Sequence, residues 1–490
     1  MTDSTERGRE ESPPEGRDSR SPRSQRVLVV GLARSGLAAV DLLLRSGVSV
    51  VATDLRDASE LGIDSPGLRA RGVELELGSQ RAEVLDGIDL VVLSPGVPLD
   101  SAIPSAARLR GTPIIGELEL AFRHSRGRWL AVTGTNGKTT TTALLGELAK
   151  TTGSRLAVAG NIGLALSGEV ESVPEDGLIV AEVSSFQLDT IESFRPHVGV
   201  LLNITADHLD RYDSFEAYAR SKARVFENQG PGDYAVLNYD DDRVAALAGM
   251  LAATVIPVSA RREVADGVFL RNGRIVSQVG GTEREIVQVD RLGLPGPHNL
   301  SNALAATAAA AAIGVAAEDA AKVLVSFTPL EHRLEPVAVV DGVRYVNDSK
   351  ATNVDSVMFA LRSFDAPIVL IAGGKDKDSD FRVLRAVVAE HVKRLVLIGE
   401  AAEKMERQLA GLVPTDRAAS LRDAVLRAQE AASPGDVVLL SPACASFDMF
   451  KDFEDRGRKF KEEVAALARG PRGRASGSRD EKRGGAGGER

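Results

Sequence analysis

Short apolar runs, each followed at once by glycine or polar residues, recur along most of this chain. Clear examples are residues 26–30, 48–53, 129–132, 178–183 and 198–202. An unbroken apolar run of this length suits a strand that is buried on both faces of a parallel sheet. Alanine- and leucine-rich stretches with helical spacing lie between several of the runs. The alternation predicts an α/β protein whose strands carry polar loops at their carboxyl ends.

The pattern divides the chain into three α/β series between two polar ends. We predict an N-terminal domain over 26–122, a central domain over 123–328 and a C-terminal domain over 329–468. Residues 1–25 and 469–490 lack the apolar side chains needed to offset the entropy of ordering, so we predict two disordered tails. A chain of 490 residues is consistent with three domains of about 150 residues each.

A glycine-rich loop at residues 133–140 follows an apolar run and precedes a helical pattern. Glycines let backbone N–H groups close around phosphate oxygens, and the N-terminus of the next helix favours the same anion. Lys138 would then reach the terminal phosphates, and the Thr139 hydroxyl would ligate magnesium. Val132 stands where the usual spacing has a glycine, so Gly134 opens a shortened loop. A tight strand-to-helix turn without a ligand is the alternative, and the Gly-Lys-Thr-Thr sequence disfavours it.

The first apolar run also ends in a glycine turn. Gly31 and Gly36 flank Ala33, and the second strand of this βαβ unit ends at Asp54. The turn would hold a diphosphate, and Asp54 would accept hydrogen bonds from a sugar hydroxyl or a pyrimidine N–H. Only two of the three glycines of a dinucleotide fingerprint are present, so a role in chain geometry alone stays open. This domain by itself would suggest a nicotinamide oxidoreductase, which the phosphate loop argues against.

Polar side chains also follow two central strands. The run 178–183 is apolar except for Glu182, and a carboxylate there is costly unless it meets a cation, so magnesium is its natural partner. The run 198–202 leads into a polar stretch that contains His208. A buried, hydrogen-bonded structural glutamate and an ordinary strand-end histidine are the alternatives. By composition alone, Lys222 on a predicted helix would be a solvated surface charge.

Three apolar runs of the third series end in polar segments. They span residues 343–346, 368–372 and 437–440. Carboxyl ends of parallel strands meet at one edge of a sheet, which predicts one shared ligand edge. In the preceding linker, 329–335, Arg333 could bind phosphate through two N–H groups of its planar fork.

The central motifs, in this order, resemble those of the Mur ligase family. They are Gly134-Thr-Asn-Gly-Lys-Thr-Thr140, Gly160-Asn-Ile-Gly163, Glu182-Val-Ser-Ser-Phe-Gln-Leu188, the stretch from Asn203 to Arg211, and Lys222. The resemblance covers about residues 26–465. It implies an ATP-dependent amide ligase with a Rossmann-like UDP-binding domain, a central P-loop ATPase-type α/β domain and a C-terminal Rossmann-like α/β domain.

The third-domain motifs resemble the members of this family that add D-glutamate to UDP-N-acetylmuramoyl-L-alanine. These motifs lie in residues 347–353, 373–377, 441–448 and 450–457. The resemblance implies that ATP, with Mg²⁺, phosphorylates the substrate carboxylate, and that the D-glutamate amine then attacks the acyl phosphate. Another ATP-dependent amide ligase, such as a folylpolyglutamate synthase, is the nearest alternative. A nicotinamide oxidoreductase is the alternative from a different class.

The resemblance also implies a role for individual residues. Catalysis would involve Lys138, Lys222, His208 and Arg333. The metal would be held by Thr139, Glu182, His208 and a carbamylated Lys222. ATP would contact Gly134, Thr135, Asn136, Gly137, Lys138, Thr139, Thr140, Asn299, Arg333, Asp348 and Lys350. The UDP-linked substrate would contact Leu32, Ala33, Arg34, Ser35, Asp54, Leu55, Gly96, Asn161 and His208. D-glutamate would contact Thr352, Lys377, Ser446, Phe447 and Phe453.

Composition limits the partners, the cellular location and the cysteine sites that we expect. The net charge of −9 gives no overall basic field, so we expect no nucleic-acid partner. No apolar run is long enough to span a bilayer and the N-terminus has no apolar signal core, so we expect a cytoplasmic protein, and we expect a monomer. Cys444 is the only cysteine, which excludes an intramolecular disulfide and a cysteine-based zinc site. Between two alanines it is expected to be a small packed residue.

Overall fold

A computed structural model describes most of the chain. The described residues are 25–161, 164–205, 207, 211–294, 296–328, 331–364, 366–376 and 379–470, without the side chains of residues 298 and 355. Nearly all of the two predicted tails lies outside them, as do His208 and Lys377. The chain forms two compact units, Met1–Ala121 with Leu166–Gly168 and Phe122–Ala165 with Glu169–Arg490. The predicted domain boundaries after residues 122 and 328 stay predictions.

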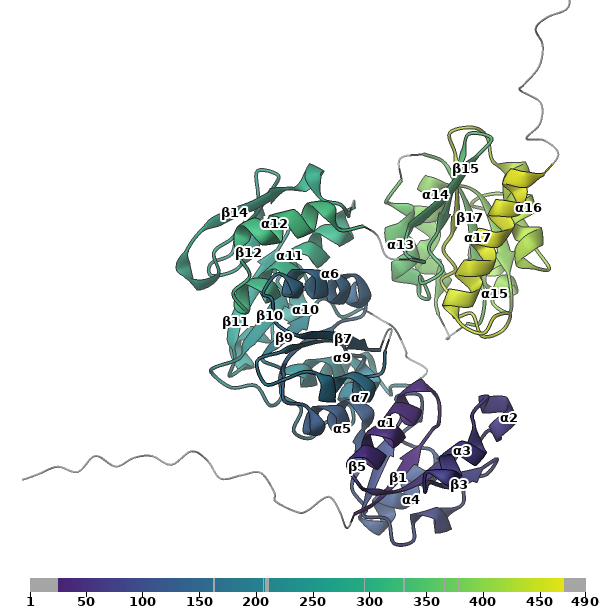
Figure 1. Cartoon of the computed structure of the whole chain (residues 1–490). Helices are drawn as coiled ribbons and strands as arrows, with labels where there is room; N and C mark the ends of the chain where they lie inside the picture. The colour runs from purple at the N-terminus through teal and green to yellow at the C-terminus, as the bar shows by residue number, and fades with distance from the viewer. Residues whose placement is uncertain are drawn as a thin grey trace, which may run out of the picture. The chain divides into compact units, whose positions relative to one another are not determined.

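The first unit contains a five-stranded parallel sheet in the order β3-β2-β1-β4-β5 (Figure 1). Its strands are β1 (Arg26–Val30), β2 (Ser49–Asp54), β3 (Glu74–Leu77), β4 (Leu90–Leu93) and β5 (Ile114–Gly116). The helices are α1 (Arg34–Arg45), α2 (Ala58–Leu61), α3 (Ser65–Ala70), α4 (Ala102–Arg110) and α5 (Glu117–His124). This strand order is that of the predicted Rossmann-like domain, in which β1 is central and its carboxyl end faces the glycine turn.

Both glycines of the first turn are needed for close backbone packing. Gly31 has a φ of +89°, which a residue with a side chain rarely adopts, and a Cβ at Gly36 would lie 1.8 Å from the Gly31 carbonyl oxygen. Gly31 and Gly36 are therefore required by the local chain geometry, whether or not the turn also binds a ligand. Helix α1 begins at Arg34, three residues before Leu37, where the apolar helical spacing begins. Gly36, a weak helix former, therefore lies inside its first turn.

The second unit contains a nine-stranded sheet in the order β14-β13-β12-β11-β10-β9-β6-β8-β7. Its strands are β6 (Arg128–Thr133), β7 (Leu156–Gly160), β8 (Leu178–Glu182), β9 (Val198–Leu201), β10 (Tyr234–Asn238), β11 (Thr254–Ser259), β12 (Val268–Arg271), β13 (Arg274–Ser277) and β14 (Arg284–Gln288). The accompanying helices are α6 (Lys138–Lys150), α8 (Ser185–Leu188), α9 (Phe215–Ala223), α10 (Asp242–Ala245), α11 (Pro297–Ala312) and α12 (Ala317–Ser326), whereas all but the last residue of α7 (Leu166–Glu169) belongs to the first unit.

The stretch from 233 to 290 contains Asn272-Gly273, a dipeptide that predicts a hairpin turn, but only part of the stretch pairs as hairpins. Strands β9, β10, β11 and β12 pair parallel, so the chain crosses over between them. Antiparallel pairing occurs in β12, β13 and β14. The predicted turn is present between β12 and β13, where Asn272 and Gly273 both have positive φ, 49° and 74°. The turn signal was local and readable, whereas pairing across a crossover depends on distant segments.

The second unit also contains a six-stranded sheet in the order β15-β16-β20-β17-β18-β19. Its strands are β15 (Glu335–Val340), β16 (Val343–Asn347), β17 (Ile368–Gly373), β18 (Val392–Ile398), β19 (Thr415–Arg417) and β20 (Val437–Leu440). The helices are α13 (Val354–Leu361), α14 (Arg385–His391), α15 (Ala402–Gln408), α16 (Leu421–Ala431) and α17 (Phe453–Arg469). Only β15 and β16 pair antiparallel, and their register shifts between Pro336 and Ala338. The strands with polar ends, β16, β20 and β17, are neighbours, which confirms one shared edge.

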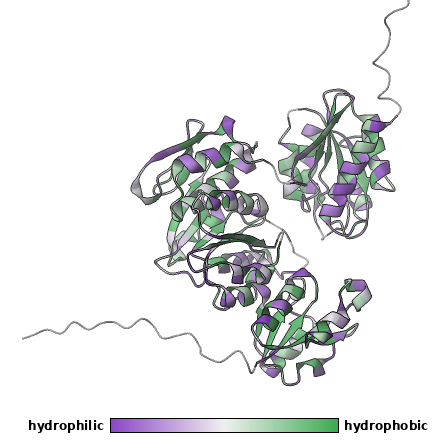
Figure 2. Cartoon of the chain, viewed as in Figure 1, coloured by the Kyte–Doolittle hydropathy of each residue, from purple (hydrophilic) through white to green (hydrophobic). Residues whose placement is uncertain are grey.

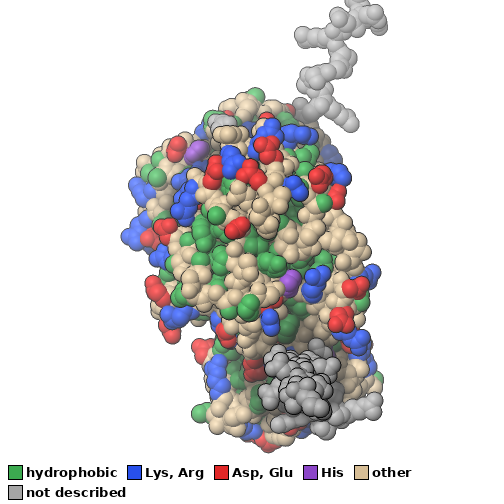
Figure 3. All heavy atoms as spheres, turned by 90° about the vertical axis from the view of Figure 1, so that its left-hand side faces the viewer, with side chains coloured by type: hydrophobic (Ala, Val, Ile, Leu, Met, Phe, Trp, Pro, Cys, Tyr) green, Lys and Arg blue, Asp and Glu red, His purple; other side chains and the backbone are tan. Residues whose placement is uncertain are grey.

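Apolar side chains fill the sheets and the inner helix faces, while hydrophilic residues gather on outer helix faces (Figure 2). Cys444 is 1% exposed, in line with its prediction as a packed residue. On the face shown in Figure 3, lysine and arginine side chains are interspersed with aspartate and glutamate. Among the described helices there is none whose length and apolar character would let it cross a bilayer.

Candidate active site

The phosphate loop connects β6 to α6 and is fixed by two close contacts at its glycines. Gly134 has a φ of +145°, and a Cβ there would lie 3.0 Å from the Leu202 side chain. Gly137 has a φ of +86°, and a Cβ there would lie 2.2 Å from the Asn302 amide oxygen. These positions therefore tolerate only glycine, as a loop that wraps an anion requires.

Two lysines meet at the same backbone carbonyl of this loop. Lys138 Nζ donates to the carbonyls of Gly134 at 2.9 Å and Thr135 at 2.8 Å. Lys222 Nζ, from helix α9, also donates to the Gly134 carbonyl at 2.9 Å. Lys222 is 2% exposed, so its interpretation as a solvated surface charge is wrong. Burial, and then the nearby Lys138 ammonium, hold the pKa of Lys222 well below its usual range.

Glu182 is the last residue of β8 and is 1% exposed. Its Oε1 accepts a hydrogen bond from Asn161 Nδ2 at 2.9 Å, whereas its Oε2 has no hydrogen-bond partner within the described residues. Only one of the two carboxylate oxygens is hydrogen-bonded, so Glu182 does not match the alternative of a fully hydrogen-bonded structural glutamate. A buried carboxylate oxygen without a donor is costly, and a divalent cation would satisfy it.

A cavity of about 290 Å³ joins these groups to loops of the six-stranded sheet. Of the predicted site residues it is lined by Thr135, Asn136, Gly137, Lys138, Thr139, Asn161, Glu182, Lys222, Arg333, Lys350, Thr352 and Phe453. No individual role was predicted for the other lining residues, although five of the seven lie in motifs quoted above; they are Ser184, Ser185, Phe186, Asp207, Asn353, and, outside the motifs, Tyr218 and Ser356. The cavity combines cationic groups, hydroxyls and carboxylates, which suits phosphate groups together with a metal ion.

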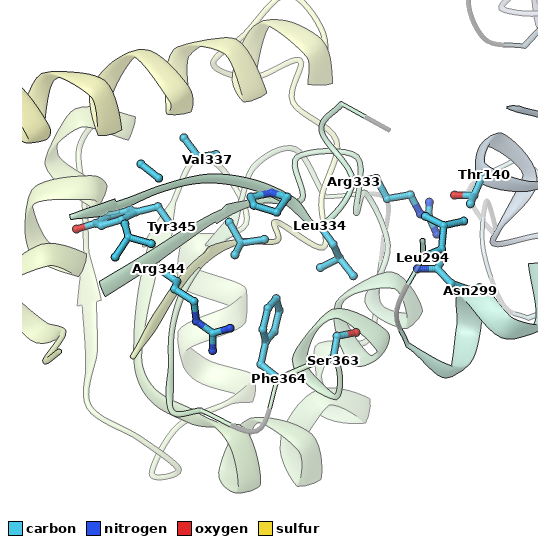
Figure 4. A pocket seen from close by; sticks show the side chains of 14 residues that line it. Thr140, Leu294, Asn299, Arg333, Leu334, Val337, Arg344, Tyr345, Ser363 and Phe364 are labelled. Carbon is cyan, nitrogen blue, oxygen red and sulfur yellow. The ribbon is translucent and has the colours of Figure 1, made fainter. Parts of the chain in front are cut away.

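A second cavity, of about 380 Å³, has mostly apolar walls (Figure 4). Thr140, Asn299 and Arg333 are the predicted site residues in its lining, and the Arg333 side chain extends toward the other two in Figure 4. Arg333 lines both cavities. Asn299, for which the resemblance implies a nucleotide contact, is not the N-cap of its helix, because Gly296 caps α11.

The backbone around Arg333 is strained. His332 and Leu334 both have left-handed φ values, 65° and 43°, which non-glycine residues rarely adopt and which cluster at functional sites. Asp348 holds this segment, because its Oδ1 accepts from the Leu334 N–H at 3.2 Å and its Oδ2 accepts from Ser441 Oγ at 2.8 Å. Burial raises the pKa of Asp348 to about 6.

The predicted D-glutamate residues are only partly brought together. Thr352 and Phe453 line the 290 Å³ cavity, and the Lys350 ammonium lies 5.1 Å from the centre of the Phe453 ring. Ser446 is buried and Phe447 is 68% exposed, and the lining of that cavity among described residues includes neither.

In the first unit, the predicted UDP-contacting residues surround the glycine turn. Asp54 Oδ2 accepts from the Leu32 N–H at 2.7 Å, and both carboxylate oxygens pair with the Arg56 guanidinium at 3.0 Å. Arg56 was not among the predicted site residues, although a basic residue two positions beyond a strand-end acid was a usable signal. Leu55 is 66% exposed. The other members of the set at this turn and the next loop, Ala33, Arg34 and Gly96, are exposed, and Ser35 is half-buried.

Family models match three parts of the chain. The N-terminal domain described as "Mur ligase MurD-like" matches residues 25–116, the Mur ligase middle domain matches 132–310, and the "Mur ligase, glutamate ligase domain" matches 332–444. Three similar proteins are each named UDP-N-acetylmuramoylalanine–D-glutamate ligase. Those of Pelotomaculum thermopropionicum and Geobacter metallireducens are 51% and 48% identical, and each match covers 91% of this chain and 98% of the relative. That of Acidobacterium capsulatum is 46% identical, over 91% of this chain and 97% of the relative.

Solved structures share the fold at low identity. A pseudomurein peptide ligase type C from Methanothermus fervidus has a TM-score of 0.59 at 18% identity, and the match covers 91% of this chain and 100% of that chain. The UDP-N-acetylmuramate-alanine ligase MurC from Thermotoga maritima has a TM-score of 0.58 at 19% identity, with 90% and 99% covered. These matches support the predicted three-domain α/β fold.

Proposed function

Because this chain belongs to the Mur ligase family, we propose that it is an ATP-dependent ligase that adds D-glutamate to UDP-N-acetylmuramoyl-L-alanine. The reaction is a step of peptidoglycan precursor synthesis, and so of cell-wall biogenesis. The observation that carries the proposal is the match to relatives named for this reaction, which reaches 51% identity and covers 98% of a relative's length. It includes the third domain, whose motifs distinguish the amino acid that is added. The oxidoreductase and folylpolyglutamate synthase alternatives have no comparable support.

The first chemical step activates a carboxylate, because an oxide is too poor a leaving group for an amine to displace. In the proposed mechanism the terminal carboxylate of UDP-N-acetylmuramoyl-L-alanine attacks the γ-phosphorus of ATP, giving an acyl phosphate and ADP. Phosphoryl transfer depends mainly on positioning and on neutralising charge. Lys138 and Arg333 line the same cavity as the phosphate loop, so both would bind the phosphate oxygens on which negative charge develops.

Magnesium is the proposed cofactor, and the donor set fits it. Thr139, Glu182, a carbamylated Lys222 and His208 would hold it, and the unpartnered Oε2 of Glu182 supports this assignment. When bound, magnesium supplies positive charge that neutralises the phosphate oxygens and orients them for transfer. Asn161 would keep Glu182 in place through its hydrogen bond, and it would contact the substrate near the reacting carboxylate.

In the second step the amine of D-glutamate attacks the acyl phosphate. The tetrahedral intermediate loses phosphate and a proton to leave the amide, so no serine or cysteine nucleophile is needed. The carboxylates of D-glutamate would be held by Thr352, Lys377, Ser446, Phe447 and Phe453. A cleft that closes over both steps would keep water from the acyl phosphate.

The two cavities divide the proposed nucleotide site. The phosphates would occupy the polar one, and the adenine ring would occupy the apolar one beside Asn299, with Arg333 between them. Asp348 would act by holding the backbone next to Arg333. We further propose that the protein works in the cytoplasm as a monomer, and that the uridine diphosphate binds at the glycine turn that follows β1.

The proposed function is tested by phosphate release from ATP and magnesium. Release should require both UDP-N-acetylmuramoyl-L-alanine and D-glutamate and should not occur with L-glutamate. Release with a different amino acid would keep the ligase chemistry but overturn the assignment of the third domain. The absence of release with every combination would refute the ligase.

The loss of activity at alkaline pH should follow the deprotonation of Lys350. Burial, with Arg333 and Lys138 nearby, lowers the pKa of this half-buried lysine to about 8, so kcat/KM for ATP should fall as the pH rises through about 8 and the ammonium is lost. Arginine keeps its charge at these pH values, so Lys350→Arg should move the fall to higher pH. The measurement is kcat/KM from about pH 6 to 10, because this ratio reports groups of the free enzyme. If kcat/KM falls over the same alkaline pH range in wild type and Lys350→Arg, the fall does not come from Lys350.

A further inference from the structure

We propose that Arg456, a residue outside the predicted site, is a positioning residue for D-glutamate. Its guanidinium joins the loops that carry the proposed D-glutamate contacts and sets their spacing. This inference rests on the proposed function. It starts from the observation that Arg456, in the first turns of helix α17, is 0% exposed although it is charged.

The guanidinium binds two of the strand-end loops directly. On the loop after β16, Nε donates to Ser349 Oγ at 2.9 Å and Nη2 donates to the Ser349 carbonyl at 2.8 Å. On the loop after β20, Nη1 and Nη2 donate to the Cys444 carbonyl at 3.2 Å, and Nη1 donates to the Ala445 carbonyl at 3.3 Å. One planar group therefore fixes the distance between two loops that are far apart in sequence.

The constraint extends to a third loop and to the helix itself. Ala445 forms an antiparallel bridge with Lys375, in the loop after β17, with N–H···O distances of 2.9 and 3.1 Å. Ser349 Oγ in turn donates to the Phe453 carbonyl at 2.8 Å. The described members of the proposed D-glutamate contacts, Thr352, Ser446, Phe447 and Phe453, all lie within three residues of an anchored position.

Stability alone does not account for a guanidinium at this place. The oxygens that it binds among described residues are a hydroxyl and backbone carbonyls, and burial lowers the pKa of Arg456 to about 10. Burying a cation without a paired carboxylate costs free energy that an apolar side chain would avoid. Arginine offers five donors in a rigid plane, whereas lysine offers a point charge. The fork, rather than the charge, is what joins the two loops.

Replacing Arg456 should affect the binding of D-glutamate more than the binding of ATP. Asp348 and Lys350, the proposed nucleotide contacts on either side of Ser349, have anchors of their own. Asp348 accepts from Ser441 Oγ and the Leu334 N–H, and the Lys350 N–H donates to the His332 carbonyl at 3.1 Å. Their positions depend less on Arg456 than the positions of Thr352 and Ser446 do. A change of spacing among the loops should therefore weaken D-glutamate binding more than ATP binding.

The test compares Arg456→Lys with wild type in the full-length protein by phosphate release, varying each substrate in turn. We expect KM for D-glutamate to rise about tenfold or more, since small misplacements of binding groups have effects of this order. KM for ATP and for the UDP-linked substrate should change less than about threefold, with kcat largely kept at saturating D-glutamate. Arg458→Lys is the matched control, because Arg458 is on the same helix and its side chain is 52% exposed. It should leave all three KM values unchanged.

Equal rises in all three KM values, or an unchanged KM for D-glutamate in a folded Arg456→Lys protein, would overturn the proposal. If Arg456→Lys does not fold, Ser349→Ala removes the hydroxyl that accepts from Arg456 Nε and donates to the Phe453 carbonyl. Since it leaves the other hydrogen bonds of the guanidinium in place, it should raise KM for D-glutamate selectively by a smaller factor. An unchanged value would again overturn the proposal. A wild-type protein whose phosphate release ignores D-glutamate would refute the proposed function instead, so the two failures are distinguishable.

Discussion

Replacing Lys222 with alanine is expected to lower kcat at least about a hundredfold, the order seen when one group that stabilises transition-state charge is removed. Part of the loss should return when high bicarbonate or a short-chain carboxylate is added. The reason lies in the surroundings of Lys222, which is 2% exposed and has a pKa well below its usual range. A depressed pKa increases the fraction of neutral amine, and a neutral amine can add to carbon dioxide. The product is an anionic carbamate that can ligate a metal ion.

The measurement is the rate of phosphate release by wild type and variant with increasing acetate or bicarbonate. Lys150→Ala is the control, because Lys150 is exposed at the far end of α6 and pairs only with Glu147 among the described side chains. It should keep wild-type activity with or without the added carboxylate. Equal activity of Lys222→Ala and wild type would rule out the carbamate.

Replacing Glu182 with glutamine should separate activity from stability. We expect kcat to fall about a hundredfold or more, because a neutral amide is a poor ligand for magnesium. The thermal unfolding midpoint should stay close to that of wild type. Oε2 of this buried carboxylate has no hydrogen-bond partner to lose within the described residues, and the saved cost of burying its charge offsets the lost attraction to Lys222 and Lys350. The amide oxygen can still accept from Asn161.

Both quantities can be measured on the same preparation, by phosphate release and by thermal unfolding with and without magnesium. Magnesium should raise the midpoint of wild type but not that of Glu182→Gln. Glu147→Gln, on the exposed face of α6, should resemble wild type. A variant that keeps its activity, or that unfolds well below wild type in the absence of magnesium, would count against Glu182 as a metal ligand.

The sequence predicted the fold well where the signals were local. Buried strands appear as apolar runs, and the glycine turns after β1 and β6 stand directly beside the strands that they end. The parallel pairing of β10 with β11 was not predicted, because a crossover pairing is set by segments that lie far apart in the chain. The hairpin of β12 and β13 could be predicted, because its Asn272-Gly273 turn depends only on adjacent residues.

The candidate site was predictable to the same extent. Motif residues such as Lys138 and Glu182 could be identified from their neighbours in sequence. The burial of Lys222 could not, since its partner Gly134 is 88 positions away, and Arg456 depends on Ser349, 107 positions away. The roles of His208 and Lys377 stay predictions, because both residues lie outside the described parts of the chain.

The edges of the six-stranded sheet bear on how the protein behaves in a crowded solution. Strand β15 forms one edge, and it contains Pro336 together with the register shift before Ala338. Strand β19 forms the other edge and is three residues long. A proline, a bulge and a short strand each interrupt the row of free N–H and C=O groups on which another chain could align. Edge-to-edge aggregation through this sheet is therefore disfavoured, and a surface substitution that straightened β15 would endanger solubility before it affected any chemistry.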